Sequence, residues 1–119
     1  MSETRLSLEE THDLIVAALI RSRTSAENAA SVAAALVAAE ADGQSGHGLR
    51  RVVGYCAQAA SGKVDGFAVA DVQRTAPGAL RVDAGFGFAY PALDTVADGL
   101  PDIAREHGVG LATIVRSHH

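Results

Sequence analysis

Hydrophobic positions in the first part of the chain recur with the period of an α-helix. In residues 7–22 they fall on one side of a helix, and Ser7 followed by Glu10 has the spacing of an N-terminal capping box. Residues 25–42 repeat this pattern, with Ser25 in the N-cap position. The pattern predicts a helical hairpin joined by a short turn. The expected inward-facing residues are Leu8, Leu14, Ile15, Ala18, Leu19, Val32, Leu36 and Val37.

A third helix and then a change of period follow this hairpin. Residues 52–62 keep a helical pattern as far as Gly62, a residue type that commonly ends helices. Residues 68–75 and 79–85 are short runs of β-type residues separated by the turn sequence Ala-Pro-Gly. These two runs predict a β-hairpin.

The remaining chain predicts one more helix and one more strand. Residues 88–108 have a helical pattern, in which Pro101 is expected to kink or split the helix and Gly108 to end it. Residues 109–119 form a β-rich run, which we expect to enter a buried sheet.

The predicted order is therefore three helices, a β-hairpin, a helix and a strand. This order favours the α/β class, with an α+β arrangement within the chain itself. We divide the chain into an N-terminal helical segment, residues 1–62, which carries a candidate substrate-binding motif, and residues 63–119, the start of an α/β part cut off after a strand.

Composition adds that the core is thin. Of the 119 residues, 48% are hydrophobic, but 24 are alanines and none is tryptophan. Alanine favours helices but buries little area, so we expect a partner surface to complete the core.

Charge and cysteine content narrow the class of protein. The chain has 14 acidic and 10 basic residues and no basic run longer than Arg50-Arg51, which argues against a nucleic-acid partner. No apolar run is long enough for a membrane span, and the N-terminus lacks the layout of a signal peptide. The single Cys56 suits a reducing compartment, and we expect a cytoplasmic protein.

The stretch DGQSGHGLRRVVGY, residues 42–55, carries the first candidate site. If a helix begins near residues 45–47, then His47, Arg51 and Tyr55 lie at successive four-residue steps close to one face. A guanidinium fits a carboxylate with two donors, and a helix N-terminus favours an anion. The pattern indicates a binding corner for a small acid. An ordinary glycine-rich turn with a solvated arginine and a core tyrosine has the same spacing, and spacing alone does not separate the two interpretations.

The second candidate site is the terminal run RSHH, residues 116–119. Neighbouring residues of a strand point to opposite sides, so at most one of His118 and His119 joins a given site, and we predict no metal centre. A histidine directly after a buried strand is better suited to general acid–base chemistry. His12 and His107 are expected to be structural or solvated, and residues 85–88, GFGF, lack the spacing of a dinucleotide-binding loop.

These two motifs resemble those of a known family. The run GHGLRRVVGY resembles the S-H-G-x-x-R-x-x-x-Y motif of the malate/L-lactate dehydrogenase family, which includes ureidoglycolate and sulfolactate dehydrogenases and lacks a Rossmann fold. The run HGVGLATIVRSHH resembles the strand of that family that ends in N-S-N-H or S-H-H. The interval of 72 residues from His47 to His119 also agrees with the family. Two motifs at this interval are more specific than either alone.

The resemblance implies hydride transfer between NADH or NADPH and a 2-oxo or 2-hydroxy acid or a cyclic imino acid. By this resemblance His119 exchanges a proton with the substrate, Arg51 binds the substrate carboxylate, and His47 and Tyr55 line and order the pocket. His47 is expected to be a catalytic residue together with His119. The resemblance also implies a homodimer for the complete protein. Family members continue well beyond His119, and their cofactor-binding region lies in that continuation. The resemblance therefore implies the N-terminal portion of such an enzyme, with an incomplete fold, inactive by itself and without an assignable cofactor-binding residue.

Two residues depart from the family pattern. Gly46 stands where many members have a serine, and Arg116 replaces a common asparagine, which adds a charge beside the expected acid–base residue. The alternative to an enzyme portion is a non-catalytic helical interaction module or a gene remnant.

Overall fold

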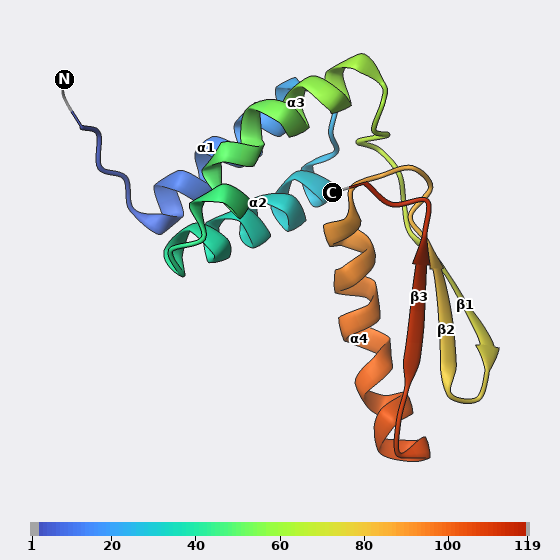
Figure 1. The fold of residues 1–119 in the computed structure, drawn as a ribbon. Coiled ribbons are helices and arrows are strands. Elements are labelled where there is room, and N and C mark those ends of the chain that lie inside the picture. The colour runs from blue at the N-terminus through green and yellow to red at the C-terminus, as the bar shows by residue number, and fades with distance from the viewer. Residues whose placement is uncertain (1–2, 119) are drawn as a thin grey trace.

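The computed structural model describes residues 3–118. Three helices, α1 (Leu8–Arg21), α2 (Ala26–Ala41) and α3 (Val52–Ser61), pack together in the N-terminal part of the chain (Figure 1). The capping box at the start of α1 is confirmed. The Glu10 N–H donates to the Ser7 hydroxyl at 3.0 Å, and the Ser7 N–H donates to the Glu10 carboxylate at 3.1 Å.

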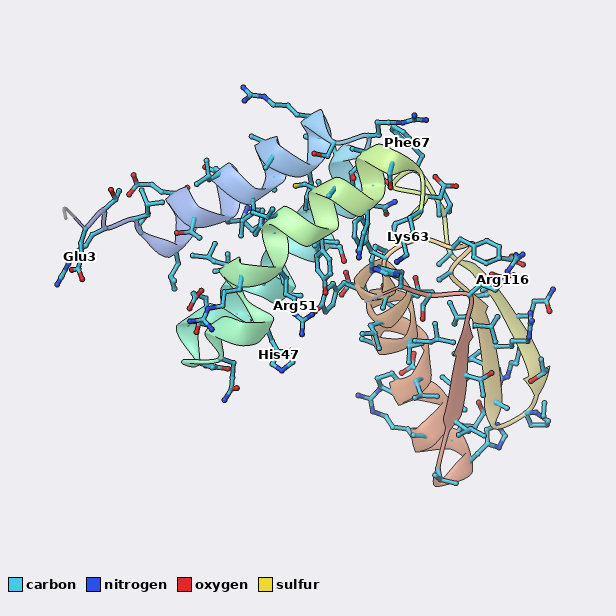
Figure 2. All side chains as sticks on the ribbon, turned by 45° about the horizontal axis from the view of Figure 1, so that its top comes forward. Glu3, His47, Arg51, Lys63, Phe67 and Arg116 are labelled. Carbon is cyan, nitrogen blue, oxygen red and sulfur yellow. The ribbon has the colours of Figure 1, made fainter. Side chains whose placement is uncertain are left out.

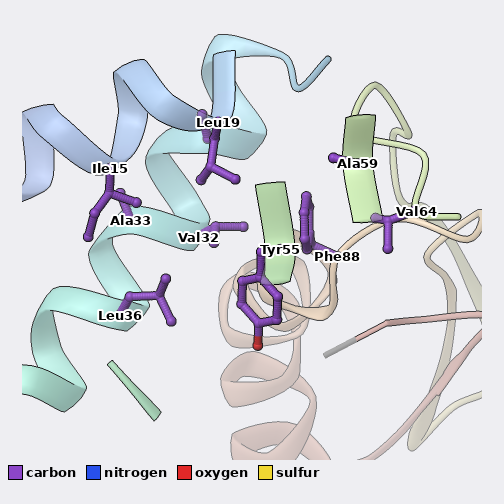
Figure 3. Close-up of a cluster of buried hydrophobic side chains, with 10 residues drawn as sticks. Ile15, Leu19, Val32, Ala33, Leu36, Tyr55, Ala59, Val64 and Phe88 are labelled. Carbon is purple, nitrogen blue, oxygen red and sulfur yellow. The ribbon is translucent and has the colours of Figure 1, made fainter. Parts of the chain in front are cut away.

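A strongly apolar cluster lies between these three helices. Ile15 and Leu19 of α1 meet Val32 and Leu36 of α2, and all four are essentially inaccessible to solvent (Figure 3). Phe88, from far along the chain, completes the same cluster. The interior is therefore shared between the helices and the segment that precedes the next helix.

The inward face of α1 is narrower than the sequence predicts. Leu8 and Leu14 were expected to face the core, but each is 58% exposed. Thr11, Ile15 and Leu19 are the buried positions, at strict four-residue steps. Because α2 and α3 pack against this one side of α1, the neighbouring positions remain at the surface.

The second part of the chain is a three-stranded sheet covered by one helix. β1 (Asp71–Ala76) and β2 (Ala79–Asp83) form the predicted antiparallel hairpin, and β3 (Leu111–Val115) pairs with β2 in parallel, so the order is β1-β2-β3. α4 (Ala89–His107) connects β2 to β3 and lies along the sheet (Figure 1). Pro101 lies inside α4, so the predicted split does not occur. Proline has no N–H to donate to the Ala97 carbonyl, but Ala97 and Pro101 are both exposed, so water can take the place of this donor.

The expectation that the last strand enters a buried sheet is wrong for the described residues. β3 is an edge strand in which every residue is exposed or half-buried, and every residue of β1 is exposed. The reason is the placement of the layers: α4 lies along one face, and α1, α2 and α3 lie beyond the end of the strands (Figure 1).

A loop between α3 and β1 ties the two parts together. The Asn28 side-chain amide of α2 donates to the Gly66 carbonyl at 3.0 Å and to the Ala68 carbonyl at 2.8 Å. Glycine is required at position 66, because a Cβ there would lie 2.2 Å from the Arg23 carbonyl oxygen. Ser31 of α2 also donates to the Asp94 carboxylate of α4 at 2.5 Å. These contacts fix the direction in which the hairpin leaves the helices.

The molecule is elongated for its length. Its radius of gyration is 15.7 Å, whereas a compact chain of this size has about 13.5 Å. Large apolar side chains remain at the surface of both parts, among them Val53, Leu93 and Leu111. This agrees with the thin core expected from the alanine content.

Leu19→Ala tests the helical core. Leu19 is fully buried, so we expect the truncation to lower the free energy of unfolding by about 2–5 kcal/mol, measured by urea denaturation. Leu14→Ala on the same helix is the matched control, because that side chain is largely exposed and should lose far less. Equal losses for the two variants would contradict the observed packing of α1.

Candidate functional site

The glycine-rich segment does not begin a helix near residues 45–47, which the argument for a single helical face required, whereas the third helix lies where the sequence predicts it. Two short 3₁₀ turns, Ser45–His47 and Leu49–Arg51, precede α3, which begins at Val52. Gly48 separates them and packs closely on α2, where a Cβ would lie 3.0 Å from the Glu40 Cβ. The Glu40 carboxylate accepts the Leu49 N–H at 3.1 Å. This close contact explains both the break in the helix and the glycine.

His47 and Arg51 therefore precede the helix that carries Tyr55, and the predicted single helical face is wrong. The Arg51 Nε–H donates to the Gly46 carbonyl at 2.9 Å, which folds the guanidinium back over the first turn. Figure 2 shows His47 and Arg51 at the same end of α3. The two 3₁₀ turns, rather than one continuous helix, place His47 and Arg51 at this end of α3.

Tyr55 is the buried member of this group. Only 5% of it is exposed, and its ring lies 5.4 Å from the Phe88 ring at a 56° tilt. Burial, assisted by the neighbouring Tyr90 phenol, raises the pKa of Tyr55 to about 12, and the nearby Arg51 charge acts in the opposite direction. Tyr55 is therefore a neutral phenol at physiological pH, and Arg51 lies close enough to act on it.

The end of the last strand meets this same region. Phe88 and His118 form a parallel β-bridge. Through it the His118 N–H donates to the Gly87 carbonyl at 2.9 Å, and the Ala89 N–H donates to the His118 carbonyl at 2.8 Å. The His118 ring contacts α3, with its Nε2 2.5 Å from the Gln58 side-chain oxygen. His119, the predicted acid–base residue, lies outside the described residues.

A shallow depression borders this junction. It has a volume of about 300 Å³ and is lined by Ala89, Tyr90 and Leu93 of α4 together with Ile114 and Ser117 of the last strand and its end. Tyr90 links this depression to Tyr55, and Ser117 directly precedes His118. The junction therefore has an open side of suitable size for a small molecule.

Arg116 does not add a free charge beside the strand end. Its guanidinium donates two hydrogen bonds to the Asp83 carboxylate, at 2.9 and 2.6 Å, and its Cζ lies 4.8 Å from the centre of the Phe86 ring. The Arg116 hydrogen bonds, followed by the Gly85 N–H, hold the pKa of Asp83 below its usual value. This pair joins the ends of β2 and β3. Figure 2 shows Arg116 on the sheet side of the molecule and Arg51 on the helical side.

His107 and His12, which were expected to be structural or solvated, each lie beside a charged side chain. The His107 ring lies 3.3 Å from the Arg74 guanidinium, and His12 lies 3.7 Å from the Asp13 carboxylate. Within residues 3–118 no group of three or more histidine, cysteine or acidic side chains is arranged to hold a metal ion. None of the helices described is long and apolar enough to cross a bilayer.

Four residues of the junction were not predicted. Gln58 was detectable, because it lies three residues after Tyr55 and so shares its side of the predicted third helix. Phe88, Tyr90 and Asp83 reach the region only through tertiary packing, which the sequence pattern does not report.

The fold is an α+β arrangement. The helical part carries the first motif, the last strand of the sheet leads into the second, and the two parts meet around Phe88. The chain belongs to the malate/L-lactate dehydrogenase family, which it matches over residues 6–119. It is 38% identical over 115 residues to a Delta(1)-pyrroline-2-carboxylate reductase of Ancylobacter novellus. The matched region covers 97% of this chain and 34% of that relative. It is 42% identical over 114 residues to a (2R)-3-sulfolactate dehydrogenase (NADP(+)) of Chromohalobacter salexigens, with 96% and 34% covered.

The fold comparison agrees with the family. The crystal structure of delta1-piperideine-2-carboxylate reductase from Pseudomonas syringae pv. tomato superimposes with a TM-score of 0.94 at 38% identity, covering 98% of this chain and 35% of that one. The predicted family is confirmed, and the described residues have its fold. The chain spans about a third of the length of these relatives.

Asp83→Asn tests the clamp between β2 and β3. The folded-state pKa of Asp83 lies below its ordinary value of 3.8, so its contribution to stability is complete above that value and is lost as the pH falls through the lower folded-state pKa. We expect the wild type to unfold at a higher urea concentration than the variant at pH 7, and the difference to shrink with acidification below pH 4. Asp102→Asn, which removes an exposed ion pair on α4, is the control. A pH-independent difference would contradict the clamp.

Proposed function

We propose that this chain is the N-terminal, substrate-side portion of an NAD(P)H-dependent oxidoreductase. The reaction is hydride transfer between the nicotinamide cofactor and a cyclic imino acid or a 2-oxo or 2-hydroxy acid. The observation that carries the proposal is the junction at which Tyr55, from the glycine-rich motif, and the strand end at His118 both contact Phe88. Two sequence-distant motifs of the family thus share one location.

Arg51 is the proposed carboxylate-binding residue. Its Nε–H is used by the Gly46 carbonyl, which orients the guanidinium without neutralising its charge. The remaining N–H groups of a guanidinium suit the two oxygens of a carboxylate. Tyr55, a neutral phenol, is proposed to order the substrate beside Arg51, and the exposed His47 to line the same pocket and assist proton transfer.

His119 is the proposed proton donor and acceptor. Its support is the motif and the anchoring of the residue before it, since both backbone polar groups of His118 are hydrogen-bonded. A proton must reach the substrate oxygen or nitrogen as the hydride is added, and an imidazole can supply it near neutral pH.

The nicotinamide cofactor, NAD or NADP, would supply the hydride. Within residues 3–118 we assign no residue to its pyrophosphate or ring, because the GFGF turn, although α4 follows it directly, lacks the glycine spacing of a dinucleotide loop. The chain's own contribution is to bind the acid, orient it and exchange the proton. We therefore expect the 119-residue chain alone to be inactive.

Small acids with a planar C=N or C=O group next to the carboxylate are the proposed substrates. Relatives named as pyrroline- or piperideine-2-carboxylate reductases and as a sulfolactate dehydrogenase support this class. We further propose a cytoplasmic homodimer. The exposed apolar side chains of α1 and α3, such as Ile20 and Val53, support a covering partner surface.

His119→Ala in the complete gene product tests the proposed function. The assay follows NADH or NADPH oxidation with Δ1-pyrroline-2-carboxylate, pyruvate and oxaloacetate as alternative substrates. We expect the wild type to reduce at least one of them and the variant to be slower by about two to four orders of magnitude, because the general acid is lost. His12→Ala is the control and should retain activity. A folded wild-type protein that reduces none of these acids would favour the non-catalytic module.

Arg51→Lys tests carboxylate binding. Lysine keeps the charge but loses the forked donors, so we expect the KM for the acid to rise while kcat changes less. The matched control is Arg50→Lys, an exposed neighbour without a proposed contact. An unchanged KM in Arg51→Lys would mean that another group binds the carboxylate.

A further inference from the structure

The two edges of the sheet are built differently. β1 forms one edge and β3 the other (Figure 1). β1 carries Asp71 and Arg74, and its pairing with β2 is irregular between Arg74 and Ala76. Charged side chains and irregular pairing are common at the edges of natural sheets, because they hinder the addition of another strand. β1 therefore has the features of a permanent edge.

β3 has none of these features. Its five residues, Leu111–Val115, include no charged residue and no proline, and their pairing with β2 is continuous. Leu111 is 63% exposed, and Val109, just before the strand, is 74% exposed. A regular, uncharged and apolar edge of this kind readily accepts a further strand.

The backbone of β3 offers hydrogen-bonding groups along this edge. The Leu111 N–H and the Val115 carbonyl each form a 2.9 Å hydrogen bond with a residue that flanks β2. In a strand the backbone groups of successive residues point to opposite sides. The N–H and carbonyl groups of Ala112 and Ile114 therefore point away from β2, and among residues 3–118 no strand pairs with them.

An apolar depression borders the start of β3. It has a volume of about 250 Å³, and its lining includes Val96 and Leu100 of α4 and Gly110, directly before the strand. The depression at Tyr90 borders the same strand at Ile114. A strand laid along β3 would cover apolar surface in the first depression and add a wall to the second.

We propose that the free edge of β3 is the docking site for a β-strand from the part of the complete gene product that follows residue 119. This inference rests on the proposal that the chain is the N-terminal portion of a longer protein. The length of the relatives supports it, since the matched region covers only about a third of each. β2, α4 and β3 form a β–α–β unit, and the parallel strands of such units usually lie in sheets that are covered on both faces. In the complete protein β3 is then an interior strand.

The first test is amide hydrogen exchange in the complete gene product, resolved to single residues. The Thr113 N–H points toward β2, whereas those of Ala112 and Ile114 point away from it. We expect the Ala112 and Ile114 amides to exchange within about tenfold of the Thr113 rate, because both sides of the strand are hydrogen-bonded. Faster exchange than this at both positions would mean that β3 remains an edge, and would overturn the proposal.

The second test uses proline, which has no N–H to donate. Thr113→Pro removes a donor to β2, whereas Ala112→Pro and Ile114→Pro remove donors that point away, a change tolerated only in an edge strand. We expect all three variants to lower the Tm of the complete gene product by about 5 °C or more. Ala112→Ser keeps the N–H and is the matched control. Tolerated prolines at 112 and 114 beside a destabilising Thr113→Pro would contradict the docked strand, and the exchange rates of the wild type decide the case where a proline variant does not fold.

The third test identifies the occupant of the edge. A photoreactive benzophenone side chain replaces Leu111, which is exposed on this strand. After illumination of the complete gene product, we expect mass spectrometry of the digested protein to show a cross-link within one chain, to a residue beyond 119. A cross-link between two chains would assign the edge to a second copy and refute the proposed occupant.

None of these measurements depends on enzymatic activity. A complete protein that protects the Ala112 and Ile114 amides but reduces no acid would refute the reductase function and leave the docking site intact. An active enzyme in which these amides exchange fast would refute the docking site alone. A gene that ends at residue 119 would leave the edge without its occupant and refute the docking site as well.

Discussion

The arrangement of the whole chain depends on Phe88 packing into the helical core. Phe88 directly precedes α4, yet it is buried with Ile15 and Leu36 rather than with the sheet. Its ring pairs with Tyr55, an interaction of about 0.5–1.5 kcal/mol beyond the area it buries. Its backbone pairs with His118. One residue therefore holds the helical part, the start of α4 and the end of the last strand together.

The contacts around Phe88 have two effects. Some fix the direction of the sheet relative to the helices, and others determine where a positive charge remains available. Asn28 and Ser31 of α2 hold the loop before β1 and the side of α4, so the sheet leaves the helices in one direction. Arg116 of the second motif is neutralised by a carboxylate, whereas Arg51 of the first is held by a neutral carbonyl. The positive charge available for an anion thus remains at the helical side, beside the buried phenol.

The sequence predicted elements better than contacts. Capping residues and hydrophobic periods located all four long helices and the hairpin, because these signals are local. The turn at Gly48 escaped prediction because the constraint is its contact with Glu40 on another helix. Likewise, the exposure of Leu14 depends on which sides of α1 the other helices cover. The paired motifs indicated the family and a shared site, whereas the contact of Gln58 with His118 became visible only once the strand end was placed against α3.

The backbone of Arg116 explains why two dissimilar residues suit this position. Its φ of +54° lies in the left-handed region, which residues other than glycine and asparagine seldom adopt. The asparagine common in the family adopts this conformation readily by itself. Arginine adopts it here while held by Asp83 and Phe86. In this chain the conformation of residue 116 therefore depends on side chains from another part of the chain, and a change at residue 83 or 86 would remove a restraint on the Arg116 backbone.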